Sequence, residues 1–359
     1  MDEALRLLDF AAGARVADGF GWLDDDGRPD PARGTPLWIT ARMTHCFALG
    51  VLLGRPGSAE LADHGLRHLP DGPDAYAHAF VVLAAASAAV AGRPGATERL
   101  AGALGHAERR FWREEEGAVV DDPGEAYRGA NANMHTVEAF LAAADATGDP
   151  AWADRALRIA TRLIDAAARA DDWRVPEHFD AAWTPLPEYN ADAPRHPFRP
   201  YGVTPGHGLE WARLLLHLRA GLGHPPAWLE PAAAALADRA WADGWDADRG
   251  GFAYTTDRAG RPVVADRFHW VVCEAIATAA VLGDAERERT ARDFAERHLV
   301  DRERGGWRHE LDPENRPASR TWQGKPDVYH ALQAMLLPGL PMRPSVAGAL
   351  SSRRASSRT

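Results

Sequence analysis

Two kinds of helical segment alternate along this chain. In one kind the residues are apolar almost all round, as in DAYAHAFVVLAAASAAVAG (residues 74–92) and RFHWVVCEAIATAAVLGD (267–284). In the other kind an apolar stripe lies opposite a stripe of Arg, Asp and Glu, as in residues 97–112, 152–170 and 287–299. A helix that is apolar all round is buried, whereas an amphipathic helix lies at the surface. The alternation therefore predicts an inner and an outer layer of helices.

A recurring unit precedes most of the apolar helices: an acidic, glycine-rich turn beside aromatic residues, then a polar segment. Its instances begin with FGWLDDDGRPD, FWREEEGAVVDDP, HFDAAWTPLPEYN, WDADRGGFAYTTDRAGRPV and LVDRERGGWRHELDPENRP, and residues 74–92 form a sixth helix without an evident hairpin. The pairs Gly250–Gly251 and Gly305–Gly306, beside alternating aromatic residues, predict short β-hairpins. Six such units predict an all-α fold, an (α/α)6 barrel with short hairpins at one end. An open solenoid of helix pairs is the alternative.

The composition and charge of the chain bear on its cellular location and on its partners. A net charge of −10 argues against a nucleic-acid partner, which needs a clustered basic surface. No apolar run approaches about 18 residues and the N-terminus lacks a signal sequence, so we expect a cytoplasmic protein without a membrane span. Cys46 and Cys273 lie in apolar helical segments and are interpreted as buried thiols. We expect one barrel domain over residues 1–340 and a disordered tail over 341–359, where small, polar and basic residues gather.

Polar residues recur in the first turn of every inner helix, and these helix starts all follow a loop. They therefore gather at one end of the ring, which predicts a shared pocket there. Buried polar groups without partners are costly, so such residues bond to one another or serve a function. The ring suits a hydroxyl-rich ligand such as a sugar, with Trp stacking on its apolar face and Arg binding its oxygens. The residues concerned are Arg42, His45, Tyr76, His78, Asn131, Asn133, His135, Glu138, His207, Glu210, His269, Trp270, Glu274, Lys325, Asp327, Tyr329 and His330.

Structural roles explain some of these residues. His45 and His78 lie deeper along their helices and are interpreted as structural, and Asp327 is interpreted as a helix cap. The pairs His135/Glu138 and His207/Glu210 have the spacing of metal ligands on a helix. However, the sequence has no HExxH motif, no cysteine set and no di-iron carboxylate pattern, so we predict no metal site.

Four motifs between Arg42 and Leu337 carry a family resemblance: NANMHTVEAF, RPYGVTPGHGLEWARLLL, the Trp270-x-x-x-Glu274 pair and KPDVYHALQA. With them the chain resembles the N-acylglucosamine 2-epimerase superfamily, and within it the branch of the mannose and sulfoquinovose isomerases. The resemblance implies an (α/α)6 barrel, the fold that the helix pattern also predicts. It implies a sugar isomerase or epimerase that uses no redox cofactor and usually no metal.

The resemblance also assigns residues. It implies that His207 and His330 are catalytic: His330 moves a proton between C2 and C1 of the sugar, and His207 assists ring opening. The form KPDVYH favours an aldose–ketose isomerase acting through a cis-enediol on D-mannose and D-fructose, or on D-lyxose and D-xylulose. The residues that it places in the sugar pocket are Arg42, Asn131, His135, Arg199, Glu210, Trp270, Glu274 and Lys325.

Other functions stay open at this point. A sugar 2-epimerase, of N-acylglucosamine or glucose/mannose type, would use the same two histidines on opposite faces of the sugar carbon, and a sulfoquinovose isomerase would need cationic groups at the C6 end. A glycoside hydrolase needs two carboxyl groups about 5–10 Å apart, for which Glu210 and Glu274 are the candidates. A non-catalytic helical scaffold would have no pocket. The predicted partner is a monosaccharide, and the chain is expected to be a monomer or a homo-oligomer.

Overall fold

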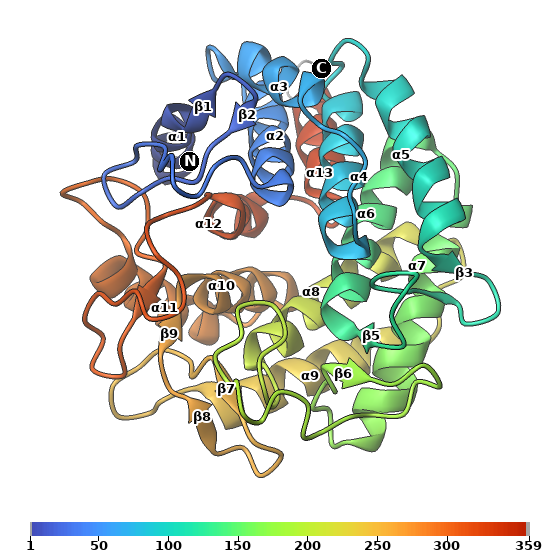
Figure 1. Ribbon diagram of the computed structural model, residues 1–359, viewed down its shortest axis with the longest axis vertical. Helices are drawn as coiled ribbons and strands as arrows, with labels where there is room; N and C mark the ends of the chain where they lie inside the picture. The colour runs from blue at the N-terminus through green and yellow to red at the C-terminus, as the bar shows by residue number, and fades with distance from the viewer. Residues whose placement is uncertain (1, 357–359) are drawn as a thin grey trace.

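In the computed structural model, which describes residues 2–356, the helices form two concentric rings (Figure 1). Each inner helix packs against its neighbours, and the last packs against both the fifth and the first, so the ring closes. This confirms the predicted barrel and excludes an open solenoid. The inner helices are α2 (Leu37–Leu52), α4 (Ala75–Val90), α6 (Ala130–Thr147), α8 (Pro205–Gly221), α10 (His269–Leu282) and α12 (Tyr329–Leu336).

The outer ring begins with the N-terminal helix, which packs against α12 and so serves as the outer partner of the last inner helix. Burial follows the predicted alternation: most of α4 is buried, whereas α5 is buried only along one stripe. The outer helices are α1 (Asp2–Ala11), α3 (Ser58–Arg67), α5 (Ala96–Arg110), α7 (Ala151–Ala160), α9 (Leu229–Gly244) and α11 (Ala285–Phe294). Short helical turns extend α1, α7, α11 and α12: η1 (Ala12–Ala14), η2 (Thr161–Ala168), η3 (Ala295–Leu299) and η4 (Leu337–Gly339).

Short antiparallel strand pairs lie at the end of the barrel where the inner helices begin. Three are hairpins: β1 (Arg15–Val16) with β2 (Gly19–Phe20), β3 (Trp112–Arg113) with β4 (Ala118–Val119), and β7 (Thr255–Thr256) with β8 (Pro262–Val264). Two join successive units: β5 (Arg128–Gly129) with β6 (His178–Phe179), and β9 (Arg267–Phe268) with β10 (Glu310–Leu311). Strands β5 and β9 run directly into α6 and α10, so this pairing fixes where those helices start.

The two glycine pairs form turns where the sequence predicts hairpins. All four glycines have φ between 64° and 82°, a conformation that residues with a Cβ rarely adopt. Each turn is closed by a single bridge, Trp245 with Phe252 and Val300 with Trp307, rather than by a ladder of strand residues. The turns thus lie where the sequence predicts them, but fewer residues on either side pair as strands than expected.

The prediction of a disordered tail is wrong for residues 341–356. Helix α13 (Val346–Ser356) packs against α2, α4 and α6, with Val346 and Leu350 buried. Asp145 Oδ2 accepts hydrogen bonds from the backbone N and the Oγ of Ser345, at 2.9 and 2.6 Å, which ties the segment to α6. The small residues let this helix fit against the barrel, and tertiary contacts replace the missing local propensity. Residues 357–359 lie outside the described part of the chain.

Cys46 and Cys273 are free and buried, as predicted. Within residues 2–356, no helix combines the length and the apolar character that crossing a bilayer requires.

Candidate active site

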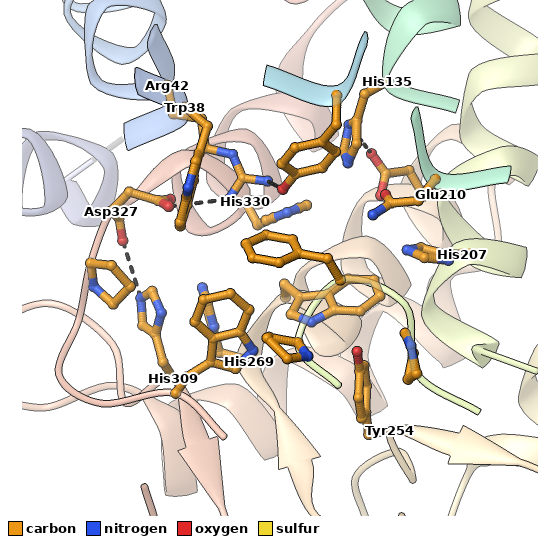
Figure 2. Close-up of a pocket in the computed structure, with 18 residues that line it drawn as sticks. Trp38, Arg42, His135, His207, Glu210, Tyr254, His269, His309, Asp327 and His330 are labelled. Carbon is orange, nitrogen blue, oxygen red and sulfur yellow. Dashed lines mark hydrogen bonds and ion pairs between the residues drawn. The ribbon is translucent and has the colours of Figure 1, made fainter. Parts of the chain in front are cut away.

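A cavity opens where the inner helices begin, as the sequence predicts. Figure 2 shows side chains from all around the ring directed toward it. Loops contribute as well as helices, including the segment before α8 and the one before α12. The lining residues are Trp38, Arg42, Tyr76, Asn131, His135, Pro197, Phe198, Pro200, His207, Glu210, Tyr254, His269, Trp270, His309, Trp322, Pro326, Asp327 and His330.

His207 lies in the first turn of α8, which begins at Pro205. Its Nδ1 is 2.9 Å from each carboxylate oxygen of Glu177, a buried residue just before β6. A carboxylate can only accept, so Nδ1 carries the proton and Nε2 is the nitrogen left for the cavity. Glu177 is not among the residues that the sequence predicts for the site. The only signal for it is an acidic residue next to the histidine of a hairpin segment.

His330 is the second residue of α12 and has the same arrangement. Its Nδ1 is 2.9 Å from Glu274 Oε1, and Glu274 Oε2 accepts a hydrogen bond of 2.9 Å from Arg213 Nε. Burial lowers the pKa of His330 well below its ordinary value, so its ring is neutral and Nε2 keeps a free lone pair. The sequence predicts Glu274 in the pocket wall, but Glu274 lies behind His330 and positions it instead.

The indole of Trp270 lies against both histidines, with ring centroids 5.2 Å from His207 and 5.7 Å from His330. It also packs closely on the start of α8, where a Cβ added to Gly206 would lie 2.5 Å from the indole ring. A glycine at this position therefore permits the close approach of Trp270 to the helix. The tryptophan thus presents an apolar surface to the cavity beside both histidines.

Arg42 is the one Arg or Lys among the described residues that line the cavity. Its Nη1 donates to Asp327 Oδ2 and its Nη2 to the hydroxyl of Tyr76, both at 3.1 Å. Although burial opposes the charged form, Tyr76 and Asp327 raise the pKa of Arg42, so the guanidinium stays charged. Asp327 Oδ1 also accepts from the backbone N of Tyr329 at 2.9 Å, the predicted role at the start of α12.

Beneath the cavity, three buried carboxyl groups surround the single guanidinium of Arg213. Its Nε bonds to Glu274, its Nη2 lies 3.5 Å from Glu210 Oε1, and its Nη1 lies 3.7 Å from Glu138 Oε1. Glu138 also accepts hydrogen bonds from the Tyr329 hydroxyl and from Gln333. Burial and the nearby Glu274 raise the pKa of Glu210 well above its ordinary value. The raised pKa favours the protonated, neutral form of the Glu210 carboxyl group.

Two groups of side chains here have the composition of a metal site. Among the described residues, ligand atoms of His135, Glu138 and Glu210 lie within 4.8 Å of one another, as do those of Glu210, Glu274 and His330. However, Arg213 lies within 3.7 Å of all three carboxylates and supplies the positive charge that a metal ion would provide. The arrangement thus fits a guanidinium better than a further cation.

Two predicted pocket residues lie elsewhere. Arg199 Nη2 donates to Glu125 at 3.1 Å and its guanidinium lies over the ring of Tyr127, outside the cavity. Lys325, the only lysine of the sequence, is buried and donates to Asp301 Oδ2 at 2.8 Å and to the backbone oxygens of Asp25 and Gly305. A buried ammonium needs several acceptors, and Lys325 finds them in the surrounding loops. The prediction for Lys325 is therefore wrong. Arg199 lines an adjoining pocket that shares Tyr76 and Asn131 with the cavity, so its contact with a substrate stays a prediction.

The remaining predicted residues do line the cavity: Arg42, Asn131, His135, His207, Glu210, Trp270 and His330. The histidines interpreted as structural make internal hydrogen bonds, His45 Nδ1 with Ser87 Oγ at 2.7 Å and His78 Nε2 with the Ala103 oxygen at 2.8 Å. Several lining residues come from loops, whose course a helical pattern does not predict. These are Phe198, Tyr254, His309 and Trp322.

Comparisons with known proteins agree with this arrangement. The sequence profile of the N-acylglucosamine 2-epimerase (GlcNAc 2-epimerase) family matches residues 19–73 and 70–334. The chain is 51% identical to a D-mannose isomerase of Thermobifida fusca, over 98% of this chain and 96% of that protein. It is 46% identical to a D-mannose isomerase of Pseudomonas cannabina pv. alisalensis, over 97% and 94%.

The chain belongs to the N-acylglucosamine 2-epimerase family. Its fold is also that of a crystal structure of a D-mannose isomerase, with a TM-score of 0.84 and 28% identity over 93% of this chain and 95% of the other. These comparisons confirm the predicted family, and the relatives confirm the predicted enzyme class, an isomerase.

Proposed function

We propose that this enzyme interconverts a free aldose and its 2-ketose, with D-mannose and D-fructose as the first pair and D-lyxose and D-xylulose as the second. The activity named for relatives at 51% and 46% identity supports this. The observation that carries the proposal is the matched pair of cavity histidines. Each has its Nδ1 held by a buried carboxylate, and each is left with Nε2 to exchange a proton with a bound sugar.

The proposed reaction begins with ring opening, in which His207 transfers a proton between the ring oxygen and the O1 hydroxyl. His330 then takes the C2 proton of the open-chain aldose through Nε2. Its low pKa keeps it in the basic form, and the product is a cis-enediol. Arg42 places fixed positive charge near the oxygens on which negative charge develops. Return of the proton to C1 gives the ketose.

A neutral sugar fits the cavity better than a sulfonated one. Arg42 is the one cationic side chain among the described lining residues, and Asp327 and Tyr76 already bond to it. A sulfonate would need further cationic or amide donors. The glycoside hydrolase hypothesis loses Glu274 as the predicted partner of Glu210, because Glu274 bonds to Arg213 and His330 and lies outside the cavity lining.

Proton transfer by histidine needs no redox cofactor and no metal, so we propose a metal-independent reaction. Arg42 and Arg213 supply the positive charge in and beneath the cavity. Placement in the cytoplasm and the choice between monomer and homo-oligomer stay predictions from the sequence.

The test is a panel of sugars, each incubated with the protein with and without EDTA: D-mannose, D-lyxose, D-glucose, N-acetylglucosamine and sulfoquinovose. The proposal predicts fructose from mannose and no effect of EDTA. Glucose without fructose would make the enzyme an epimerase, and loss of activity in EDTA would contradict the metal-independent reaction.

A further inference from the structure

Glu210 has an environment that its place in the cavity wall does not by itself explain. The residue is 1% exposed, and both of its carboxyl oxygens are buried without a hydrogen-bond partner among the described residues. An unpartnered buried carboxyl group is costly to retain. Because Glu210 lines the cavity, its oxygens are placed to find their partner in a bound substrate.

Burial and the neighbouring carboxylates Glu274 and Glu138 favour the neutral form of Glu210, and nearby cations oppose this only in part. From α8, Arg213 Nη2 lies 3.5 Å away, and from α6, His135 Nδ1 lies 3.7 Å away, the latter contact drawn in Figure 2. Glu138 of α6 and Glu274 of α10 also lie around Arg213, and Arg42 of α2 acts from further off. One guanidinium cannot neutralise three carboxylates, so the protonated form is favoured for at least one of these carboxyl groups. Glu210 is that group, because the other two accept hydrogen bonds from neighbouring side chains.

Aldose–ketose conversion moves two protons. One goes from C2 to C1, and His330 carries it in the proposed mechanism. The other must leave O2 and arrive at O1, because O1 is a carbonyl oxygen in the aldose and a hydroxyl oxygen in the ketose. Arg42 cannot serve here, since an arginine does not release a proton in proteins. A neutral carboxylic acid can both give and take a proton.

We propose that Glu210 carries the hydroxyl proton between O1 and O2. As His330 Nε2 takes the C2 proton, the electrons of the C–H bond form the C1=C2 bond, and O1 takes the proton of the Glu210 carboxyl group. The Glu210 carboxylate then takes the O2 proton as the C2=O2 bond forms and C1 takes the proton from His330. Both residues end in their starting states, so no proton or electron is gained or lost.

The geometry allows this division of work. Glu210 and His330 both line the cavity, and a carboxyl oxygen of one lies within 4.8 Å of a ring nitrogen of the other, so both groups border the space that one sugar would occupy. His207 is held by Glu177 in another part of the wall and is left for ring opening. This inference rests on the proposed aldose–ketose activity, and its test must separate the two.

The test is Glu210→Gln, which keeps the shape and hydrogen bonding of the side chain but cannot relay a proton. We expect kcat for D-mannose to fall by roughly two to four orders of magnitude, the contribution of a proton-transfer group, with KM changed far less. Glu230→Gln, an exposed glutamate of α9, is the matched control and should keep its kcat.

A Glu210→Gln kcat within tenfold of wild type would overturn the inference, whereas a wild-type protein that makes no ketose would overturn the proposed function instead. If Glu210→Gln fails to fold, Glu210→Ala decides the question. Added acetate should restore part of its turnover, more strongly at low pH, because the protonated acid can replace the missing carboxyl group. Folded Glu210→Ala with no response to acetate would contradict the proposal.

Discussion

His207 and His330 come from different inner helices, yet both rings lie against the indole of Trp270, at centroid distances of 5.2 and 5.7 Å. Both also have Nδ1 held at 2.9 Å by a buried carboxylate, Glu177 for one and Glu274 for the other. The two imidazoles therefore share one tautomer, with Nε2 available to the cavity. In the proposed mechanism, this repeated arrangement brings two proton-transfer groups to one substrate.

Replacing Glu177 by Gln should impair His207 without removing it. The carboxylate fixes the tautomer and orientation of the ring, and loss of such a partner lowers turnover by at least about tenfold. The effect should fall on ring opening, so it should be smaller for a substrate supplied in open-chain form. Rates of anomer interconversion and of ketose formation, measured by NMR, check this. An equal decrease in both rates, or no decrease in either, would contradict the role given to Glu177.

The pH dependence of His330 follows from its burial. Its pKa is lowered well below the ordinary histidine value of about 6.5, so the ring stays neutral as the pH falls through that value and gains a proton only at lower pH. Side-chain NMR of the histidines should show several resonances that do not titrate through about pH 6.5, because burial also lowers the pKa of others, such as His135 and His269; the resonance of His330 is one of them. Its absence in the His330→Ala variant assigns it. A midpoint at or above the ordinary value would disprove the neutral base.

Lys325→Met should destabilise the protein rather than remove a substrate contact. It breaks a buried ion pair with Asp301, which costs about 3–5 kcal/mol when one partner is lost. Urea unfolding measures the change. Arg302→Met, which removes the surface ion pairs of Arg302 with Glu296 and Glu3, is the control and should cost less than about 1 kcal/mol. Unchanged stability combined with a large rise in KM would contradict this and indicate that Lys325 contacts the substrate.

Gly206 and Gly208, both in the first turn of α8, allow a matched pair of substitutions to Ala. A Cβ on Gly206 would lie 2.5 Å from the Trp270 ring, whereas one on Gly208 would meet Ala240 at an ordinary 3.4 Å. Gly206→Ala should displace Trp270 and lower kcat by about tenfold or more, because small misplacements in an active site are costly. Gly208→Ala should keep its kcat and gain up to about 1 kcal/mol of stability from helix propensity. Steady-state kinetics and thermal unfolding of both variants test this.

Much of the fold is predictable because the inner and outer helices differ in pattern. The apolar residues of α4 leave no exposed polar face, while α5 has one, and this contrast recurs around the ring. Helix α13 was not predictable in the same way. Its residues are small and polar, and it is stabilised by contacts with α2, α4 and α6, which the local sequence does not encode.

The site was predictable where its residues lie on inner helices and not where they lie on loops. His207, Glu210 and His330 follow from the convergence of helix starts. Glu177, by contrast, is brought to His207 by the pairing of β6 with β5, a long-range contact. Arg199 and Lys325 lie on loops whose course the sequence pattern leaves open, and their side chains bond to Glu125 and Asp301 outside the cavity lining.

The most direct measurement is the conversion of D-mannose in D2O by the wild-type enzyme and by His330→Ala, followed by NMR. With wild type we predict D-fructose that carries deuterium at C1 to the extent that the His330 proton exchanges with solvent. With His330→Ala we predict product formation slower by roughly two to four orders of magnitude, while His224→Ala, an exposed histidine, should match wild type. Glucose in place of fructose from wild type, or an undiminished rate from folded His330→Ala, would contradict the account.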